Sequence, residues 1–274
     1  MISIITGIYN QRAMNEIFYE TLKRNTKNPF ELIVVDNQST DGSTDYFAEK
    51  EHVVLLRNDG NYNYPYCQNA GLKKAKYDLV CFFNNDILVA PDWDKRMLDI
   101  FSKNKSLQML SVASNDHLES KPVQQKLARK WKRIKHPLQF ILGNSKTSLN
   151  IMKKFMYGDF NTFAEKRFQK WGYKLIEGYS GSALMTRKTF IDDLGGWDKR
   201  IQAADYDLFN RVKKRSLSDK NVMPVQLALG IYFHHYQKLT LKKKYPPFKN
   251  KSTMIRLADK WGEETATLRK DIVG

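Results

Sequence analysis

The chain has 274 residues, of which 42% are hydrophobic and 12% aromatic, so it can bury a folded core and is too apolar for a disordered protein. Its two cysteines exclude a disulfide framework and indicate a reducing compartment. The formal net charge of +17 favours anionic partners, which include nucleic acid, anionic lipid and acidic substrates.

The N-terminal segment, residues 1–9, has the pattern of a strand and lacks the basic leader of a secretion signal. No apolar stretch approaches the roughly 18 residues of a spanning helix. We therefore expect a cytoplasmic protein that is either soluble or peripheral at the inner face of the membrane.

Short apolar segments rich in β-branched residues alternate with helical segments through the first half of the chain. The predicted strands cover residues 2–8, 30–35, 52–56, 79–83 and 109–113. Apolar residues at helical spacing fill the intervals between them. This alternation predicts an α/β fold of Rossmann type, with a mostly parallel sheet flanked by helices.

Residues 121–174 contain fourteen Lys or Arg but two Asp or Glu, a net charge of +12. Aromatic and aliphatic residues are interleaved, and Gly, Pro and Ser are few, which predicts a basic helical insertion. A solvated lysine-rich surface without a ligand is the alternative. Regular structure then resumes at residues 178–186, and a helix is expected at residues 205–214. Residues 236–274 form a basic C-terminal extension.

Polar clusters follow three of the predicted strands, at residues 6–10, 36–39 and 84–86. Ligands of α/β sheets bind beyond the carboxyl ends of the strands, so these clusters indicate one shared crevice. A single Asp after a strand is often only a turn or cap residue. The carboxylate of Asp86 is a hard oxygen ligand suited to Mn²⁺ or Mg²⁺, which could bridge a diphosphate.

Three segments together resemble the family 2 glycosyltransferases of the GT-A fold: VDNQSTDGS at residues 35–43, NND at 84–86, and DYDL at 205–208 followed by Arg211. The rhamnosyltransferase-like branch of bacterial polysaccharide synthesis is the nearest match. The resemblance implies one GT-A domain over residues 1–274. Its nucleotide-sugar-binding half is residues 1–115, and its acceptor-binding half is residues 116–235.

The resemblance also implies roles for individual residues. Asp86 matches the last acid of the metal-binding DxD motif, whose first Asp is replaced by Asn84. His234 or His235 falls where a late histidine completes the metal or diphosphate site, and His234 is preferred. The implied nucleotide-sugar-binding residues are Thr6, Tyr9, Asp36, Asn69, Gly71, Asn84 and Asn85, and the implied acceptor-binding residues are Gly181, Ser182 and Trp197.

Asp205 lies where the family places its catalytic base, preceded by Ala204 where a second acid is common. A sugar hydroxyl must lose its proton as it attacks the anomeric carbon, and general-base help of this kind is worth about 10²–10⁴-fold. A carboxylate with an ordinary pKa of about 3.9 is ready to accept that proton at neutral pH. Attack opposite the departing diphosphate inverts the anomeric centre. An N-cap role is the structural alternative for Asp205.

We therefore expect metal-dependent, inverting transfer from a UDP- or dTDP-linked sugar to a hydroxyl of a glycan or lipid-linked glycan. The basic insertion, residues 121–174, is the expected contact for the acceptor or for an anionic membrane. One rival is a nucleic-acid-binding protein, or a transferase acting on DNA, that uses the basic surface. Another is a sugar-nucleotide-binding module without catalysis. A nucleotidyltransferase is disfavoured, because no basic glycine-rich loop is found near the N-terminus.

Overall fold

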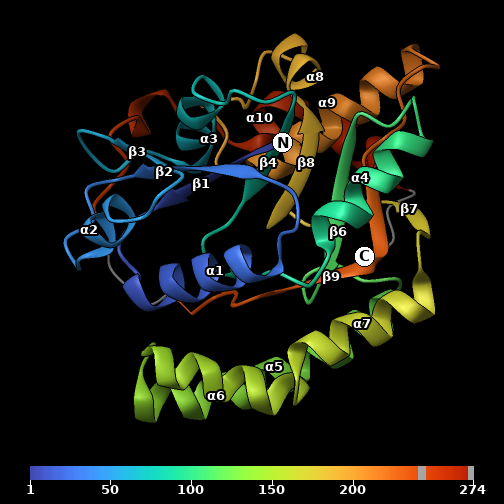
Figure 1. Ribbon diagram of the computed structural model, residues 1–274. Coiled ribbons are helices and arrows are strands. Elements are labelled where there is room, and N and C mark those ends of the chain that lie inside the picture. The colour runs from blue at the N-terminus through green and yellow to red at the C-terminus, as the bar shows by residue number, and fades with distance from the viewer. Residues whose placement is uncertain (240–244, 271–274) are drawn as a thin grey trace.

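The computed structural model describes residues 1–239 and 245–270 (Figure 1). Within these residues the core is a nine-stranded sheet in the order β3-β2-β1-β4-β8-β6-β9-β5, with β7 pairing beside β9. The strands are β1 (Ile2–Ile8), β2 (Phe30–Asp36), β3 (Val53–Arg57), β4 (Leu79–Phe83), β5 (Ile87–Leu88), β6 (Met109–Ser114), β7 (Leu175–Glu177), β8 (Ala183–Arg187) and β9 (Gln226–His235).

The first four strands form the parallel half of the sheet, as the sequence predicts. In register, Ile5 of β1 lies opposite Ile33 of β2 and Phe82 of β4. All three side chains are fully buried, which explains why these strands are continuous apolar runs instead of alternating ones. The predicted boundaries agree with the observed ones to within one or two residues.

The second half of the sheet is mixed. β8 lies between β4 and β6 and runs antiparallel to both, whereas β9 runs parallel to β6. Ala183, where β8 begins, pairs with Phe83, where β4 ends, so β8 runs back along β4 after the chain has passed through β6 and the insertion. The expectation of a mostly parallel sheet therefore describes β3-β2-β1-β4 and not the second half.

Helices cover both faces of the sheet (Figure 1). Phe18 of α1 and Met97 of α4 pack with Ile4 on one face, whereas Leu72 of α3 and Leu208 of α9 pack on the other. The helices before the insertion are α1 (Arg12–Asn25), α2 (Ser43–Ala48), α3 (Tyr64–Leu72) and α4 (Trp93–Lys103), and those after β8 are α8 (Lys188–Asp193) and α9 (Ala204–Ser218).

The basic insertion forms three helices, as predicted: α5 (Lys121–Leu142), α6 (Lys146–Tyr157) and α7 (Phe160–Trp171). α5 and α6 lie side by side below α1, and α7 continues beneath β9 (Figure 1). A third apolar cluster joins them to the domain through Trp131 and Met152. The Lys146 ammonium also pairs with two carboxylates of α1. The insertion is therefore packed onto the domain and is not a linker.

The C-terminal extension crosses back over the domain. It forms a 3₁₀ turn, Lys251–Thr253, and the short helices α10 (Leu257–Trp261) and α11 (Glu264–Leu268). The Ile255 amide donates a 2.8 Å hydrogen bond to the Arg200 carbonyl, just before α9. Residues 240–244 and 271–274 of the predicted extension lie outside the described residues. Over the described parts of the chain, no helix has both the length and the apolarity to cross a bilayer.

Candidate active site

Two cavities adjoin at the sheet edge where β1, β4 and β6 end. The larger has a volume of about 840 Å³ and the smaller about 280 Å³. Tyr64 and Gln202 line both cavities, so the two adjoin, and together they are called the crevice below. Asn84 faces the larger cavity, whereas Asn85 and Asp86 line the smaller one. The structure thus brings the predicted strand-end cluster, residues 84–86, to the boundary between the two.

Asp205 lies in the first turn of α9 and lines the larger cavity. Its carboxylate packs directly against Gly181, where any side chain would place its Cβ 2.2 Å from Asp205 Oδ2. Burial raises the pKa of Asp205, because the charged form loses solvation there. The N-cap of α9 is Ala203, so Asp205 is the second residue of the helix and is not the N-cap residue. Backbone N–H groups of this first turn act on its carboxylate, which also lines the cavity.

Asp207, two residues later, has the opposite environment. It is fully buried, and its carboxylate accepts hydrogen bonds from Arg211 Nε at 2.9 Å and Trp261 Nε1 at 2.8 Å. Lys260 Nζ lies 2.6 Å from the same carboxylate. Asp207 thus ties α9 to the C-terminal extension, which leaves Asp205 as the acid of this segment that faces the cavity.

A chain of hydroxyl groups fixes the segment before β8. The hydroxyls of Ser114, Ser180 and Ser182 are linked in series by 2.9 Å hydrogen bonds, and all three side chains are buried. The Ser182 carbonyl accepts a 2.9 Å hydrogen bond from the backbone N–H of Asn84. Gly181 and Ser182 both line the larger cavity. The predicted acceptor-side glycine and serine therefore lie at the cavity on a rigid support.

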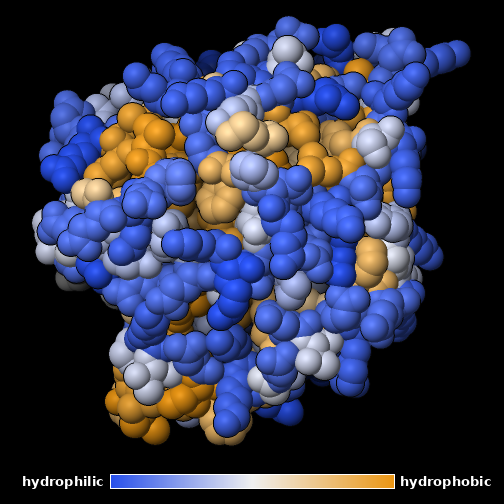
Figure 2. All heavy atoms as spheres, viewed as in Figure 1, coloured by the Kyte–Doolittle hydropathy of each residue, from blue (hydrophilic) through white to orange (hydrophobic). Residues whose placement is uncertain are grey.

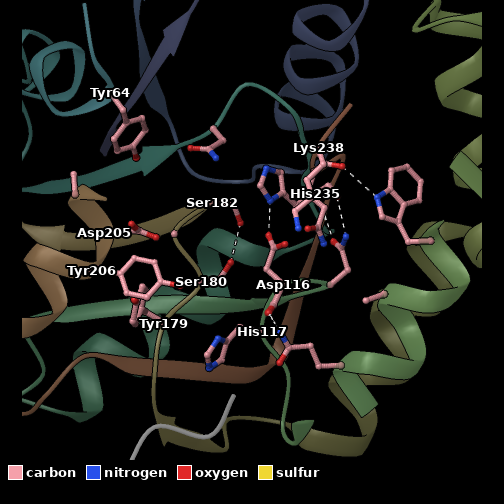
Figure 3. Close-up of a pocket in the computed structure, with 18 of the residues that line it drawn as sticks. Tyr64, Asp116, His117, Tyr179, Ser180, Ser182, Asp205, Tyr206, His235 and Lys238 are labelled. Carbon is pink, nitrogen blue, oxygen red and sulfur yellow. Dashed lines mark hydrogen bonds and ion pairs between the residues drawn. The ribbon is translucent and has the colours of Figure 1, made fainter. Parts of the chain in front are cut away.

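His235 lies between two carboxylates, Asp86 and Asp116, and Figure 3 shows it beside Asp116. Its Nε2 is 3.1 Å from Asp86 Oδ1, and its Nδ1 pairs with Asp116 Oδ2. Burial works against a charged imidazole, but the two carboxylates outweigh it and hold the pKa of His235 well above its usual value. Asn115 fixes the backbone of His235 through hydrogen bonds of 2.7 and 2.9 Å.

His234, the histidine preferred from the sequence, does not reach Asp86. Successive side chains of a strand point to opposite faces, and His234 points into the insertion. It is fully buried, its Nδ1 lies 2.8 Å from the Tyr157 hydroxyl, and its ring packs edge to face against Trp131. Burial lowers the pKa of His234 well below its usual value, so the ring is neutral. The structure therefore places His235, and not His234, at the candidate metal-ligating cluster.

The donor atoms around Asp86 fit a divalent cation by type. Two carboxylates and one imidazole, from Asp86, Asp116 and His235, supply hard oxygen and nitrogen ligands that Mn²⁺ and Mg²⁺ accept. Each of the three side chains is between 17% and 27% exposed, so the group opens onto the crevice. Among the described residues, no three His, Cys, Asp or Glu side chains are arranged as a preformed metal site.

The smaller cavity is lined by Tyr9 and Asn85, two of the predicted nucleotide-sugar-binding residues. The Tyr9 ring packs edge to face on Tyr245 of the C-terminal extension at 5.6 Å. The next two residues, Asn10 and Gln11, both have positive φ angles, of 56° and 70°. Left-handed backbone in non-glycine residues is strained and gathers at ligand sites. Gln11, in the turn after β1, also lines the smaller cavity.

Asp36 and Thr6 lie near the smaller cavity without lining it. Asp36 accepts hydrogen bonds from the Ser39 amide at 3.0 Å and the Thr44 hydroxyl at 2.7 Å. It borders a separate hollow of about 410 Å³ together with Arg57. Thr6 is fully buried, and its hydroxyl has no hydrogen-bond partner among the described residues. Both residues are at strand ends as expected, but neither faces the crevice directly.

Three further predicted site residues belong to the packing of the domain. Asn69 uses its amide to hold the Trp197 backbone, with hydrogen bonds of 2.7 and 2.9 Å. A Cβ at Gly71 would lie 2.3 Å from Ile5 Cγ2, so this glycine lets α3 approach β1. Trp197 is 2% exposed and packs edge to face on Tyr64 and Phe82. The structure brings none of the three to either cavity.

Several cavity residues were not anticipated from the sequence. Asn115 and Asp116 follow β6, so the rule that selected residues 84–86 also applies to them. Tyr179 and Arg269 come from a turn and from the last described residues, and no local pattern marks them. Long-range packing alone brings them to the crevice.

The insertion forms the wall of the larger cavity away from Asp205. Trp131, Lys132 and Lys135 of α5 line it, joined by Lys238 just after β9. Figure 3 shows Asp205 and Lys238 on opposite sides, with Asp116 and His235 between them in this view. The inner face of the basic insertion is therefore part of the site.

Solved structures share this fold. The mannosyltransferase PcManGT from Pyrobaculum calidifontis, in complex with GDP-Man and Mn²⁺, matches with a TM-score of 0.56 and 13% identity over 88% of this chain and 59% of its own. TarS from S. aureus, in complex with UDP, matches with a TM-score of 0.54 and 14% identity, over 85% and 59%. These likenesses define the fold as that of the GT-A glycosyltransferases.

Residues 3–195 match the family-wide sequence model described as "Glycosyl transferase family 2". The chain therefore belongs to glycosyl transferase family 2, which confirms the predicted family and class of enzyme. An uncharacterized glycosyltransferase of Haemophilus influenzae is 26% identical over 110 residues, 40% of this chain and 37% of that protein. The putative glycosyltransferase EpsH of Bacillus subtilis is 22% identical over 116 residues, 41% and 34%. The matches thus span little more than a third of these relatives. The rhamnosyltransferase-like branch stays a prediction.

Proposed function

We propose that the protein is an inverting glycosyltransferase that moves a sugar from a nucleoside-diphosphate sugar to an acceptor hydroxyl, with Asp205 as the general base. One observation carries this proposal: the Asp205 carboxylate lines a cavity of about 840 Å³ that adjoins the cavity beside Asp86. Acceptor and donor would therefore meet between these two acids.

Asp205 would accept the proton of the acceptor hydroxyl as its oxygen attacks the anomeric carbon. Gly181 leaves room for the carboxylate, and the linked serine hydroxyls hold the glycine in place. Burial of Asp205 raises its pKa and so makes the carboxylate a stronger base than an exposed aspartate. Attack from the Asp205 side, opposite the leaving diphosphate, inverts the anomeric centre.

The donor would lie in the smaller cavity, with its nucleoside against Tyr9 and its diphosphate toward Asp86. The structural neighbours bind GDP-Man or UDP, which supports a nucleoside-diphosphate donor. We propose a UDP- or dTDP-linked sugar. Asp36, which borders the separate hollow with Arg57, is the proposed contact of the base or ribose.

Asp86 and His235 would hold the divalent cation, Mn²⁺ or Mg²⁺, which offsets the negative charge of the leaving nucleoside diphosphate. The Mn²⁺ in the PcManGT complex supports a metal in this fold. Asn84 lies beside them in place of the first acid of the motif.

Thermal unfolding with UDP, dTDP, GDP and CDP, each with and without Mn²⁺, tests the donor site. A ligand at 100 times its dissociation constant adds about 2.7 kcal/mol to the free energy of unfolding. We expect a metal-dependent rise in melting temperature with one nucleotide. If no nucleotide raises the melting temperature under either condition, the proposal fails.

The acceptor is proposed to be a glycan or lipid-linked glycan, reached at an anionic membrane surface. At the end of α5, Phe140 is 92% exposed and Ile141 is 73% exposed. This apolar tip is visible at the lower left of Figure 2, where α5 and α6 meet in Figure 1. α5 also carries seven Lys or Arg and no Asp or Glu. Exposed apolar residues beside clustered cations are the pattern of a membrane-surface contact.

Flotation with vesicles tests the membrane contact. We expect the protein to float with vesicles containing phosphatidylserine and not with purely zwitterionic ones, and salt should weaken the binding. Phe140→Ser with Ile141→Ser should abolish flotation while leaving nucleotide binding intact. Binding that depends on salt but not on these two side chains would contradict a membrane contact at the tip.

Nucleic-acid binding is the second candidate, and the basic surface of α5 favours it. Against it, Lys132 and Lys135 line the cavity that holds Asp205, and so belong to the proposed site of transfer. A gel-shift assay at about 50 and 200 mM salt tests for nucleic-acid binding, because the affinity of a protein for nucleic acid falls steeply as the salt concentration rises. The third reading, a binding module without catalysis, is tested by turnover of the donor that binds.

A further inference from the structure

Three lysines gather on the wall of the larger cavity that faces Asp205: Lys132 and Lys135 of α5, and Lys238 after β9. Lys135 is only 4% exposed. Its Nζ donates to one neutral group, the Gln237 carbonyl, at 3.2 Å. Among the described residues, none of these three ammonium groups has a carboxylate within the 4.0 Å of an ion pair.

This arrangement is unfavourable without a ligand. Burying a charged ammonium with no counter-charge costs solvation free energy, and like charges nearby add to the cost. Burial together with Lys238 and Lys132 lowers the pKa of Lys135, in agreement with this environment. Other cations of the protein in similar settings are paired, as Arg167 is with Glu119. An anion bound in the cavity would relieve the repulsion.

We propose that the acceptor carries a phosphate, diphosphate or carboxylate, and that Lys132, Lys135 and Lys238 bind this anionic group while the acceptor hydroxyl lies at Asp205. The proposal rests on the proposed glycosyl transfer and adds to it the chemical class of the acceptor. It also gives the inner face of the basic insertion a role in selecting substrates.

The position of the lysines favours the acceptor over the donor as the source of the anion. Lys132 and Lys135 line the larger cavity, which holds the proposed base, and not the smaller cavity beside Tyr9. Asp116 and His235 lie between Lys238 and Asp205 in Figure 3. In the proposed function the diphosphate of the donor binds near Asp86 with the divalent cation, so the lysines form a second anion site.

The test uses the full chain saturated with the nucleoside diphosphate and Mn²⁺ that stabilise it, so that the donor site is filled. Inorganic phosphate and pyrophosphate are then titrated by calorimetry. We expect the wild-type protein to bind them and Lys135→Met to bind at least about tenfold more weakly, because charge-assisted hydrogen bonds are lost. Lys126→Met is the matched control, since Lys126 lies on the outer face of the same helix.

Lys132→Met with Lys238→Met repeats the test at two exposed positions, where folding is not at risk. The proposal is overturned if the variants bind pyrophosphate as the wild type does. It is also overturned if saturating nucleotide abolishes pyrophosphate binding, because the lysines would then serve the donor. Nucleotide binding itself tests the proposed function, so failure of the donor site and failure of the anion site are distinguishable.

Two further probes separate the sources of the anion. Geranyl diphosphate competing better than pyrophosphate, with geraniol inactive, would support a lipid-linked acceptor. Methyl glucuronide competing where methyl glucoside does not would support an acidic glycan. If neither geranyl diphosphate nor methyl glucuronide competes with bound pyrophosphate, the assignment of the anionic group to the acceptor is overturned.

Discussion

The two sides of the crevice are built in different ways. On the proposed donor side, the residues around Asp86 and Tyr9 follow β4 and β1, so the backbone of the parallel sheet sets their positions. On the proposed acceptor side, the wall combines α5, the segment after β9 and Arg269 near the end of the described chain. The first side depends on sheet register and the second on side-chain packing between distant segments.

This difference indicates which side of the crevice can change its side chains without disturbing the sheet. A strand-end site keeps its geometry as long as the sheet forms, which suits a nucleotide and a metal. A wall made by an inserted helix can change its side chains without disturbing the sheet, which suits the selection of an acceptor. The positive charge of α5 would then serve the selection of the acceptor and not the formation of the sheet.

The largest expected effect is on the base. Asp205→Asn should lower kcat by about 10²–10⁴-fold, because the amide cannot accept the proton. Nucleotide binding should persist. Asp207→Asn is the matched control: it should lower the free energy of unfolding by about 3 kcal/mol by weakening a buried ion pair. Steady-state kinetics and chemical denaturation measure the two. Loss of stability with unchanged kcat in Asp205→Asn would contradict its role as base.

Gly181→Ala tests whether the Asp205 carboxylate needs the space that Gly181 leaves for it. Its Cβ would displace the Asp205 carboxylate, and a shift of this size can lower kcat by about 10²-fold. Gly71→Ala is the control from the donor side, since it clashes with Ile5 and should reduce stability. Kinetics and melting temperatures of both variants separate the two effects. Equal loss of stability in both would mean that Gly181 serves packing.

On the donor side, Asp86→Ala should remove the metal-dependent part of nucleotide stabilisation, about 2.7 kcal/mol at 100 times the dissociation constant. His235→Ala should weaken the same effect. His234→Ala should leave it unchanged, because His234 lies away from Asp86. Melting curves with Mn²⁺ and the stabilising nucleotide measure all three. A loss in His234→Ala equal to that in His235→Ala would reverse the assignment.

The smallest effect is on the pH profile. The base works only when deprotonated, so kcat/KM falls as pH falls through the pKa of Asp205. Since burial raises this pKa, the fall should begin at higher pH than the ordinary value of about 3.9 allows. The acid limb of the profile, measured at saturating metal, checks this. An acid limb centred below pH 4 would contradict the buried environment of Asp205.

The structure places Asp205, Gly181 and Ser182 at the larger cavity, whereas of the predicted nucleotide-sugar-binding residues it places Tyr9 and Asn85 at the smaller one. Residues 84–86 were found because they follow an apolar strand, and that pattern is local. Asp205 was found by resemblance, and its environment against Gly181 could not be read from spacing. The choice between His234 and His235 depends on which face of β9 meets the insertion, which only tertiary packing determines. The resemblance implies an acceptor contact for Trp197, but packing against Tyr64 and Phe82 buries this side chain, and no local pattern distinguishes the two environments.

The C-terminal extension also affects the order in which the protein becomes functional during synthesis. Tyr245 and Phe248 line the smaller cavity, and Arg269 lines the larger one. The sheet strands, which end with β9 at His235, can pair before these residues leave the ribosome. A chain that stops after β9 would thus keep the strands of the sheet but lack part of the lining of both cavities.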